Sequence, residues 1–116
     1  GRSATLRARE DNRRDLVLFD LALDYGQCAR IALTAADQAS PQALHKACGL
    51  WQKLGKSVSV IDDVAGMVVM RSVCMLANEA ADAVNQQVCS PADVDIAMQA
   101  GVNYPRGPLA WADAIG

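Results

Sequence analysis

The chain of 116 residues lacks several features that common classes of protein require. Charged residues interrupt its apolar runs well before the roughly 18 residues that a membrane span needs, and no cleavable apolar leader is recognisable. The formal net charge is only -2, so no basic excess would attract nucleic acid. We expect a soluble, cytoplasmic protein with no nucleic-acid or membrane partner. Because the chain begins at Gly1 and ends on Gly116 without a polar tail, we also expect a piece of something longer.

The cysteines give little indication of a metal site or of disulfide bonds. The four cysteines form no C-x-x-C pair and have no neighbouring histidine pattern, and they are Cys28, Cys48, Cys74 and Cys89. Their apolar neighbours favour small core residues of a reduced protein over zinc ligands or disulfides. With 52% hydrophobic and 21% charged residues, the chain is too apolar to be disordered.

Catalytic motifs are equally scarce. No G-x-G-x-x-G turn occurs, so this stretch alone should hold no NAD. Gly49 to Ser57 resembles a phosphate-binding loop, but its glycine spacing is wrong and it leads into a predicted strand. The only histidine, His45, falls on the polar side of a predicted helix, which favours a solvated residue over a general base. Asp62 and Asp63 point to opposite faces and form no dyad, and we predict that Asp63 caps the following helix.

The N-terminal region is rich in arginine, as shown by Arg2, Arg7, Arg9, Arg13 and Arg14. These side chains could meet an anion such as a nucleotide 3′-phosphate. Because Glu10, Asp11 and Asp15 interrupt the set, a solvated face is the favoured interpretation.

The first half of the chain alternates helices and strands. Ser3 is predicted to cap a short helix through about Glu10, and Ser40 with Pro41 starts a second helix that ends at Gly55. Apolar runs predict strands over 16–19, 30–34 and 57–61. The last two strands flank the second helix, which is the order of a parallel crossover unit.

The second half is predicted to be helical. Residues 67–86 contain neither Pro nor Gly and carry two adjacent apolar stripes, one through Met70, Cys74, Ala77, Ala81 and Val84, the other through Val69, Val73, Leu76, Ala80 and Ala83. So wide an apolar surface indicates cover on two sides, by the helix's own domain and by another chain or domain. Ser90 and Pro91 start a helix closed by Gly101, and Pro108 starts a last helix after a rigid loop.

These residues resemble a known family. The motifs Asn78-Glu79-Ala80, Ser90 to Asp95, Tyr104-Pro105-Arg106-Gly107-Pro108 and Ile115-Gly116 look like the C-terminal helical domain of NAD-dependent 3-hydroxyacyl-CoA dehydrogenases. More weakly, the first half is similar to the end of that family's dinucleotide-binding domain. The resemblance implies a mainly α fold in which an α/β remnant of about three strands and two helices (1–62) precedes a helical dimerisation and substrate-closure domain (63–116).

The chain departs from the family where the family carries its chemistry. The strand Leu18 to Asp20 has no histidine where the resemblance places the catalytic one, Ala32 is the best match for the catalytic glutamate, and Met70 replaces an asparagine. The packing and loop residues of the family pattern are present in this chain. This pattern resembles the second, non-catalytic copy found in long family members.

The resemblance therefore implies a parent enzyme that oxidises a 3-hydroxyacyl-CoA with NAD, in which this segment serves assembly and cleft closure without catalysis or cofactor of its own. Its partner would be a second copy or another domain of the same chain. The alternative is a stand-alone acyl-CoA-binding or dimerisation module. Substrate-binding candidates taken from the resemblance are Arg71, Tyr104, Pro105, Arg106, Gly107 and Pro108. A purely structural role of the loop from Tyr104 to Pro108 is favoured over contact with substrate.

Overall fold

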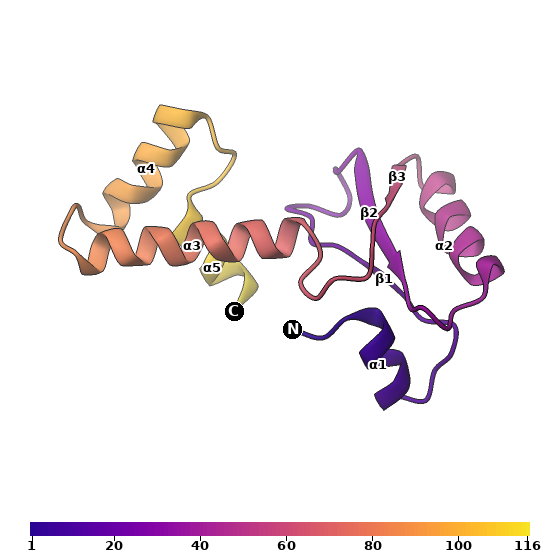
Figure 1. Cartoon of the computed structure of the whole chain (residues 1–116). Helices are drawn as coiled ribbons and strands as arrows, with labels where there is room; N and C mark the ends of the chain where they lie inside the picture. Colours follow the sequence, from indigo (N-terminus) through magenta and orange to yellow (C-terminus); the bar gives the residue numbers. More distant parts are fainter. The chain divides into compact units, whose positions relative to one another are not determined.

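The computed structural model describes all residues from 1 to 116 and contains five helices and three strands (Figure 1). In chain order the elements are α1 (Ala4–Glu10), β1 (Val17–Phe19), β2 (Arg30–Ala35), α2 (Pro41–Lys53), β3 (Ser57–Val60), α3 (Val69–Asn85), α4 (Pro91–Val102) and α5 (Pro108–Ile115). They form two compact units, Gly1–Met70 and Arg71–Gly116. The predicted fold class, a small α/β portion followed by helices, is confirmed. No helix combines the length and the apolar content that crossing a bilayer would require.

The sheet of the first unit has the strand order β1-β2-β3. β1 runs antiparallel to β2, with Phe19 opposite Leu33, and β2 runs parallel to β3, with Ile31 beside Val58. Parallel neighbours need a crossover connection, and α2 supplies it between β2 and β3. The predicted strand, helix and strand unit is therefore confirmed.

The two helices of this unit cover opposite faces of the sheet. Successive side chains of a strand point to opposite faces, so neighbouring residues of β1 contact different helices. Leu18 faces α1, and Phe19 faces α2, where its ring lies 5.2 Å from the ring of Trp51. The α1 side is packed mainly with small side chains, namely Ala4, Ala8 and Ala36 with Leu16, Leu18 and Ala39 around them. Small side chains let the backbone of α1 approach the sheet closely.

The start of α1 is capped from two places. The Ser3 hydroxyl accepts the N–H of Leu6 at 3.2 Å, as predicted. The Asp63 carboxylate accepts the N–H groups of Ala4 at 2.6 Å and Thr5 at 2.7 Å. The prediction that Asp63 caps the long helix is therefore wrong.

The reason for this difference lies in the chain after Asp63. Gly66 and Met67 both adopt positive φ angles, 81° and 48°, and this turn separates Asp63 from the first residue of α3. The carboxylate is thereby free to serve a helix that precedes it in the sequence by nearly sixty residues. Local spacing alone pointed to the wrong helix.

The second unit consists of α3 from Arg71 onward, α4 and α5. The buried residues of α3 are Val73 and Ala80, both from one of the two predicted stripes. The Ser90 hydroxyl accepts the N–H of Asp93 and donates to its carboxylate, which confirms this helix start. α4 does not close at Gly101 as predicted. It continues to Val102 and is capped by Asn103, whose left-handed conformation (φ 60°) asparagine tolerates well.

Another carboxylate caps α5. The two oxygens of Asp95 accept the N–H groups of Leu109 at 2.9 Å and Ala110 at 3.0 Å. The Asp95 side chain reaches this position only because Gly107 has no side chain: a Cβ on Gly107 would lie 2.1 Å from the Asp95 carboxyl carbon. Gly107 is therefore required by close packing against Asp95.

We expect Asp63→Asn to destabilise the chain by about 1–2 kcal/mol, because an amide accepts less well at the start of a helix. Burial acts to raise the pKa of Asp63, but hydrogen bonds from Thr5, Ala4 and Ser3 outweigh it and lower the pKa below its ordinary value. The stabilisation is thus complete above the unfolded pKa of about 3.9 and is lost as the pH falls through the lower folded value.

Urea unfolding at pH 7 and at pH 3 measures both effects. The matched control is Asp62→Asn, because Asp62 is exposed and its side chain caps no helix. Equal loss in the two variants at pH 7 would contradict the assignment of Asp63 as a cap.

We expect Gly107→Ala to cost about 1–3 kcal/mol of unfolding free energy, since the added methyl group displaces the Asp95 carboxylate from α5. Gly101→Ala is the matched control, because a Cβ there meets no atom and the position lies inside α4. The control should be neutral or stabilise the chain by up to about 1 kcal/mol. Thermal unfolding followed by circular dichroism checks both, and similar melting temperatures for the two variants would refute the steric argument.

Candidate functional site

Asp20 follows directly after β1 and is the most buried charged residue of the chain, with 2% of its surface exposed. One carboxylate oxygen accepts the N–H groups of Leu21 (2.8 Å) and Met70 (3.2 Å). The other oxygen accepts those of Val68 (2.9 Å) and Val69 (2.7 Å). A carboxylate has about four acceptor positions, so all of them are occupied. Asp20 is the cap of α3, a role that sequence analysis gave to Asp63.

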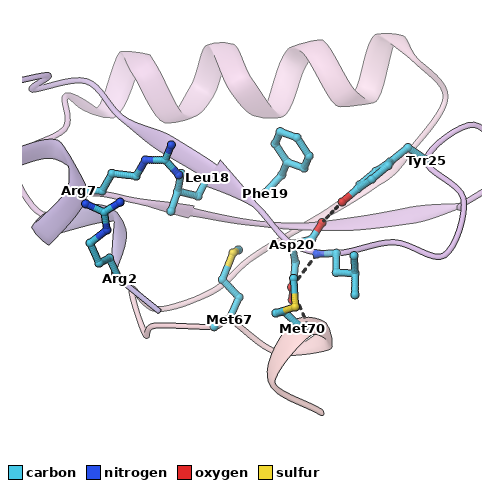
Figure 2. A pocket seen from close by; sticks show the side chains of 10 residues that line it. Arg2, Arg7, Leu18, Phe19, Asp20, Tyr25, Met67 and Met70 are labelled. Carbon is cyan, nitrogen blue, oxygen red and sulfur yellow. Dashed lines mark hydrogen bonds between the residues drawn. The ribbon is translucent and has the colours of Figure 1, made fainter. Parts of the chain in front are cut away.

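A pocket of about 230 Å³ adjoins this cap within the first unit (Figure 2). Its apolar wall comes from Leu18 and Phe19 at the end of β1 and from Met67 and Met70 around the start of α3. The capping hydrogen bonds of Asp20 hold these two segments together. The pocket is therefore a direct consequence of the cap.

Aromatic contacts fix one side of the pocket. The ring of Phe19 lies 5.6 Å from that of Tyr25 in an edge-to-face arrangement, and also packs against Trp51. The Tyr25 hydroxyl donates a hydrogen bond of 3.3 Å to the Asp20 carbonyl oxygen. Tyr25 thus links the pocket wall to the residue that caps α3.

Two arginines of the N-terminal set line the pocket, Arg2 and Arg7. Arg2 pairs with Glu10, and Arg7 lies 3.6 Å from Asp11, in both cases with about half of each side chain exposed. All five arginines of the set are exposed, as expected of a solvated face. The pocket contact of Arg2 and Arg7 was not visible in the sequence, because it depends on how α1 docks.

The helical unit has its own apolar cavity, of about 280 Å³. Leu76 and Ala80 of α3, Val94 and Met98 of α4, and Pro108 at the start of α5 contribute to its walls. The cavity lies against the apolar stripe that contains both buried residues of α3.

The structure spreads the substrate-binding candidates of the sequence analysis rather than gathering them. Arg71 is exposed on α3, and no hydrogen bond or ion pair joins it to the loop that ends at Pro108. Pro105 is exposed and Arg106 half-buried, and neither lines a described cavity.

The remaining loop residues have packing roles. Tyr104 is half-buried with its ring 6.1 Å from the ring of Trp111. Gly107 is buried over Asp95, and Pro108 is buried at the first position of α5 and lines the apolar cavity. Asp95, which belongs to a motif quoted above, is the residue that holds this loop, and its role required the three-dimensional structure.

Other chemical candidates stay apart. His45 is exposed on α2, as predicted, and no three potential metal ligands gather anywhere in the chain. The prediction that all four cysteines are core residues is wrong: Cys74 is exposed and the other three are half-buried. Periodicity placed Cys74 on an apolar stripe, but that stripe is not the one that packs within its own unit.

The start of α2 offers no cradle for the phosphates of a dinucleotide. The connection from β2 contains no glycine, and Pro41 has no N–H to donate. The N–H of Ser40 donates to Asp15 at 2.7 Å, and the N–H of Ala43 is taken by the Ser40 hydroxyl at 3.3 Å. The start of α2 therefore does not fit the phosphates of NAD.

Two family descriptions match adjacent parts of the chain. Residues 1–64 match the "3-hydroxybutyryl-CoA dehydrogenase reduced Rossmann-fold domain", and residues 66–116 match the "3-hydroxyacyl-CoA dehydrogenase, C-terminal domain". The chain is 45% identical over 91 residues to 3-hydroxyadipyl-CoA dehydrogenase of Escherichia coli K12, which covers 78% of this chain and 19% of that protein. It is 40% identical over 67 residues to a probable 3-hydroxybutyryl-CoA dehydrogenase of Bacillus subtilis, covering 58% of this chain and 23% of that protein.

A crystal structure of 3-hydroxybutyryl-CoA dehydrogenase from Escherichia coli K12 matches the whole chain, with a TM-score of 0.88 and 38% identity. The match covers 24% of that structure. The chain therefore spans about a quarter or less of the length of these relatives.

We expect Asp20→Asn to lower the unfolding free energy by about 2–3 kcal/mol, because the amide group cannot accept all of the N–H groups that the buried carboxylate serves. Asp37→Asn is the matched control, since the Asp37 side chain is exposed and makes no hydrogen bond or ion pair. Denaturant unfolding gives the stability, and hydrogen exchange at the amides of Val68 and Val69 gives the local effect. Unchanged protection of those amides would show that Asp20 is not the cap.

Proposed function

Because this chain belongs to the 3-hydroxyacyl-CoA dehydrogenase family, we propose that it is part of an NAD-dependent enzyme that oxidises a 3-hydroxyacyl-CoA to the 3-oxoacyl-CoA. Within that enzyme the segment serves assembly and closure of the acyl-CoA cleft, and it carries out no catalysis itself. The residues proposed to contact substrate through the parent are Arg71 and the loop from Tyr104 to Pro108.

The observation that carries the non-catalytic part of this proposal is the occupied carboxylate of Asp20. By resemblance, the end of β1 and position 70 are where the family has its catalytic histidine and asparagine. Here those positions are adjacent, since the Met70 N–H donates to Asp20. The Asp20 oxygens are filled by amide donors, so this carboxylate has no acceptor position left for a substrate hydroxyl proton.

The position matched to the catalytic glutamate also offers no acceptor for the proton of a substrate hydroxyl. Ala32 on β2 has only a methyl side chain, and its carbonyl oxygen accepts the Asp20 N–H at 3.0 Å. Hydride transfer from a hydroxyl carbon needs a base for the departing proton. None of the three matched positions supplies one. In the parent enzyme, NAD supplies hydride acceptance when bound, and we assign its site to sequence outside this chain.

Assembly is supported by the exposed apolar surface of the helical unit. Met75, Ile96 and Val102 are each more than half exposed, and Val88 is 72% exposed. Residues 71–116 bury few apolar side chains of their own, and units of this size usually need a partner to fold stably. The proposed partner is a second copy of the chain or another domain of the parent.

The second candidate is a stand-alone acyl-CoA-binding module. The apolar cavity of about 280 Å³ in the helical unit favours it over a bare scaffold, because it is large enough to take part of an acyl chain.

The test uses the 116-residue chain with NAD and 3-hydroxybutyryl-CoA. We expect no nicotinamide reduction at 340 nm under conditions where the E. coli relative turns over, because proton acceptor and dinucleotide cradle are both missing. Calorimetric titration with acetoacetyl-CoA separates the two candidates: no saturable heat supports the scaffold, and saturable heat supports the binding module. Turnover by the chain itself would refute the proposal.

A further inference from the structure

We propose that the pocket beside Asp20 binds a short-chain organic anion, a carboxylate on an apolar chain of about four to six carbons, with Arg2 and Arg7 as its charge partners. The site lies entirely within the unit Gly1–Met70. The proposal does not depend on the role of the chain in a dehydrogenase.

The size of the pocket limits the ligand. A volume of about 230 Å³ lies below the range of about 300–1,000 Å³ that is typical of sites for drug-sized ligands, so we choose a small ligand of about eight non-hydrogen atoms. Hexanoate has that number. A nucleotide is too large to be enclosed, so the 3′-phosphate considered in the sequence analysis is not the occupant we propose.

The pocket is lined by both apolar and charged side chains. Leu18 and Met67 offer surface for an alkyl chain, and Met side chains adapt readily to ligands of varied shape. The charged lining groups are Arg2, Arg7 and Asp20. The Asp20 carboxylate is satisfied by backbone N–H groups, which leaves the two guanidinium groups as the charges able to recognise an anion.

The arginines keep capacity for a ligand despite their ion pairs. Each guanidinium carries five N–H donors in a planar fork that matches a carboxylate. The pairs with Glu10 and Asp11 lie at the exposed surface, where such pairs contribute little. Figure 2 shows the Arg7 side chain, from α1, beside Leu18 of β1, with Arg2, from the residues before α1, nearby, while the Phe19 ring points to the α2 side of the strand. An anion bound there would join α1 to the sheet.

The experiment titrates hexanoate into the 116-residue chain, with the methyl groups of Met67 and Met70 labelled for NMR. We expect saturable shifts at these methyl groups. Arg2→Gln and Arg7→Gln should each weaken hexanoate binding about tenfold, because each removes a charged donor. Arg9→Gln is the matched control, since Arg9 lies on α1 with Arg7, is exposed like Arg2 and Arg7, and does not line the pocket.

Two further probes define the chemistry, 1-hexanol for the chain without charge and inorganic phosphate for charge without chain. Both should bind at least tenfold more weakly than hexanoate. Equal binding of hexanol, equal binding of phosphate, absence of methyl shifts, or equal loss in the Arg9 variant would each overturn the proposal. Because the readout needs neither NAD nor turnover, its failure is distinguishable from failure of the proposed function.

Discussion

Capping of helix N-termini by aspartates from elsewhere in the chain is the interaction on which this structure depends. Asp63 serves α1, Asp20 serves α3 and Asp95 serves α5. The first N–H groups of a helix have no partner within it, and the helix dipole favours a negative charge there. The separations in sequence are 59, 49 and 14 residues. Each carboxylate therefore satisfies a helix end and also ties together two elements that local sequence does not connect.

The same capping interaction bears on our proposal that this chain keeps the family scaffold without carrying out the family's chemistry. The cap brings the end of β1 to the start of α3, and these are the two places where the resemblance puts the family's catalytic histidine and asparagine. In this chain Asp20 joins the end of β1 to the start of α3, and backbone N–H groups occupy its acceptor positions. A side chain so engaged stabilises the junction and cannot also exchange protons with a substrate.

The same junction shapes the pocket in the first unit. Met67 and Met70 approach Leu18 and Phe19 because the Asp20 cap draws the start of α3 to β1. The positive φ angle of Met67, a conformation rarely adopted outside glycine, asparagine and aspartate, places its side chain at this wall. The pocket therefore depends on the hydrogen bonds by which Asp20 caps α3.

The sequence by itself determined the elements and their order. Ser40 with Pro41 and Ser90 with Pro91 marked two helix starts, apolar runs marked the strands, and the motifs of the second half indicated the family. These signals are local, since caps and periodicity act over a few residues. Only the tertiary structure decided which carboxylate serves which helix, which stripe of α3 packs, and which arginines face a pocket. Those choices rest on contacts between residues far apart in the chain, and no local spacing encodes them.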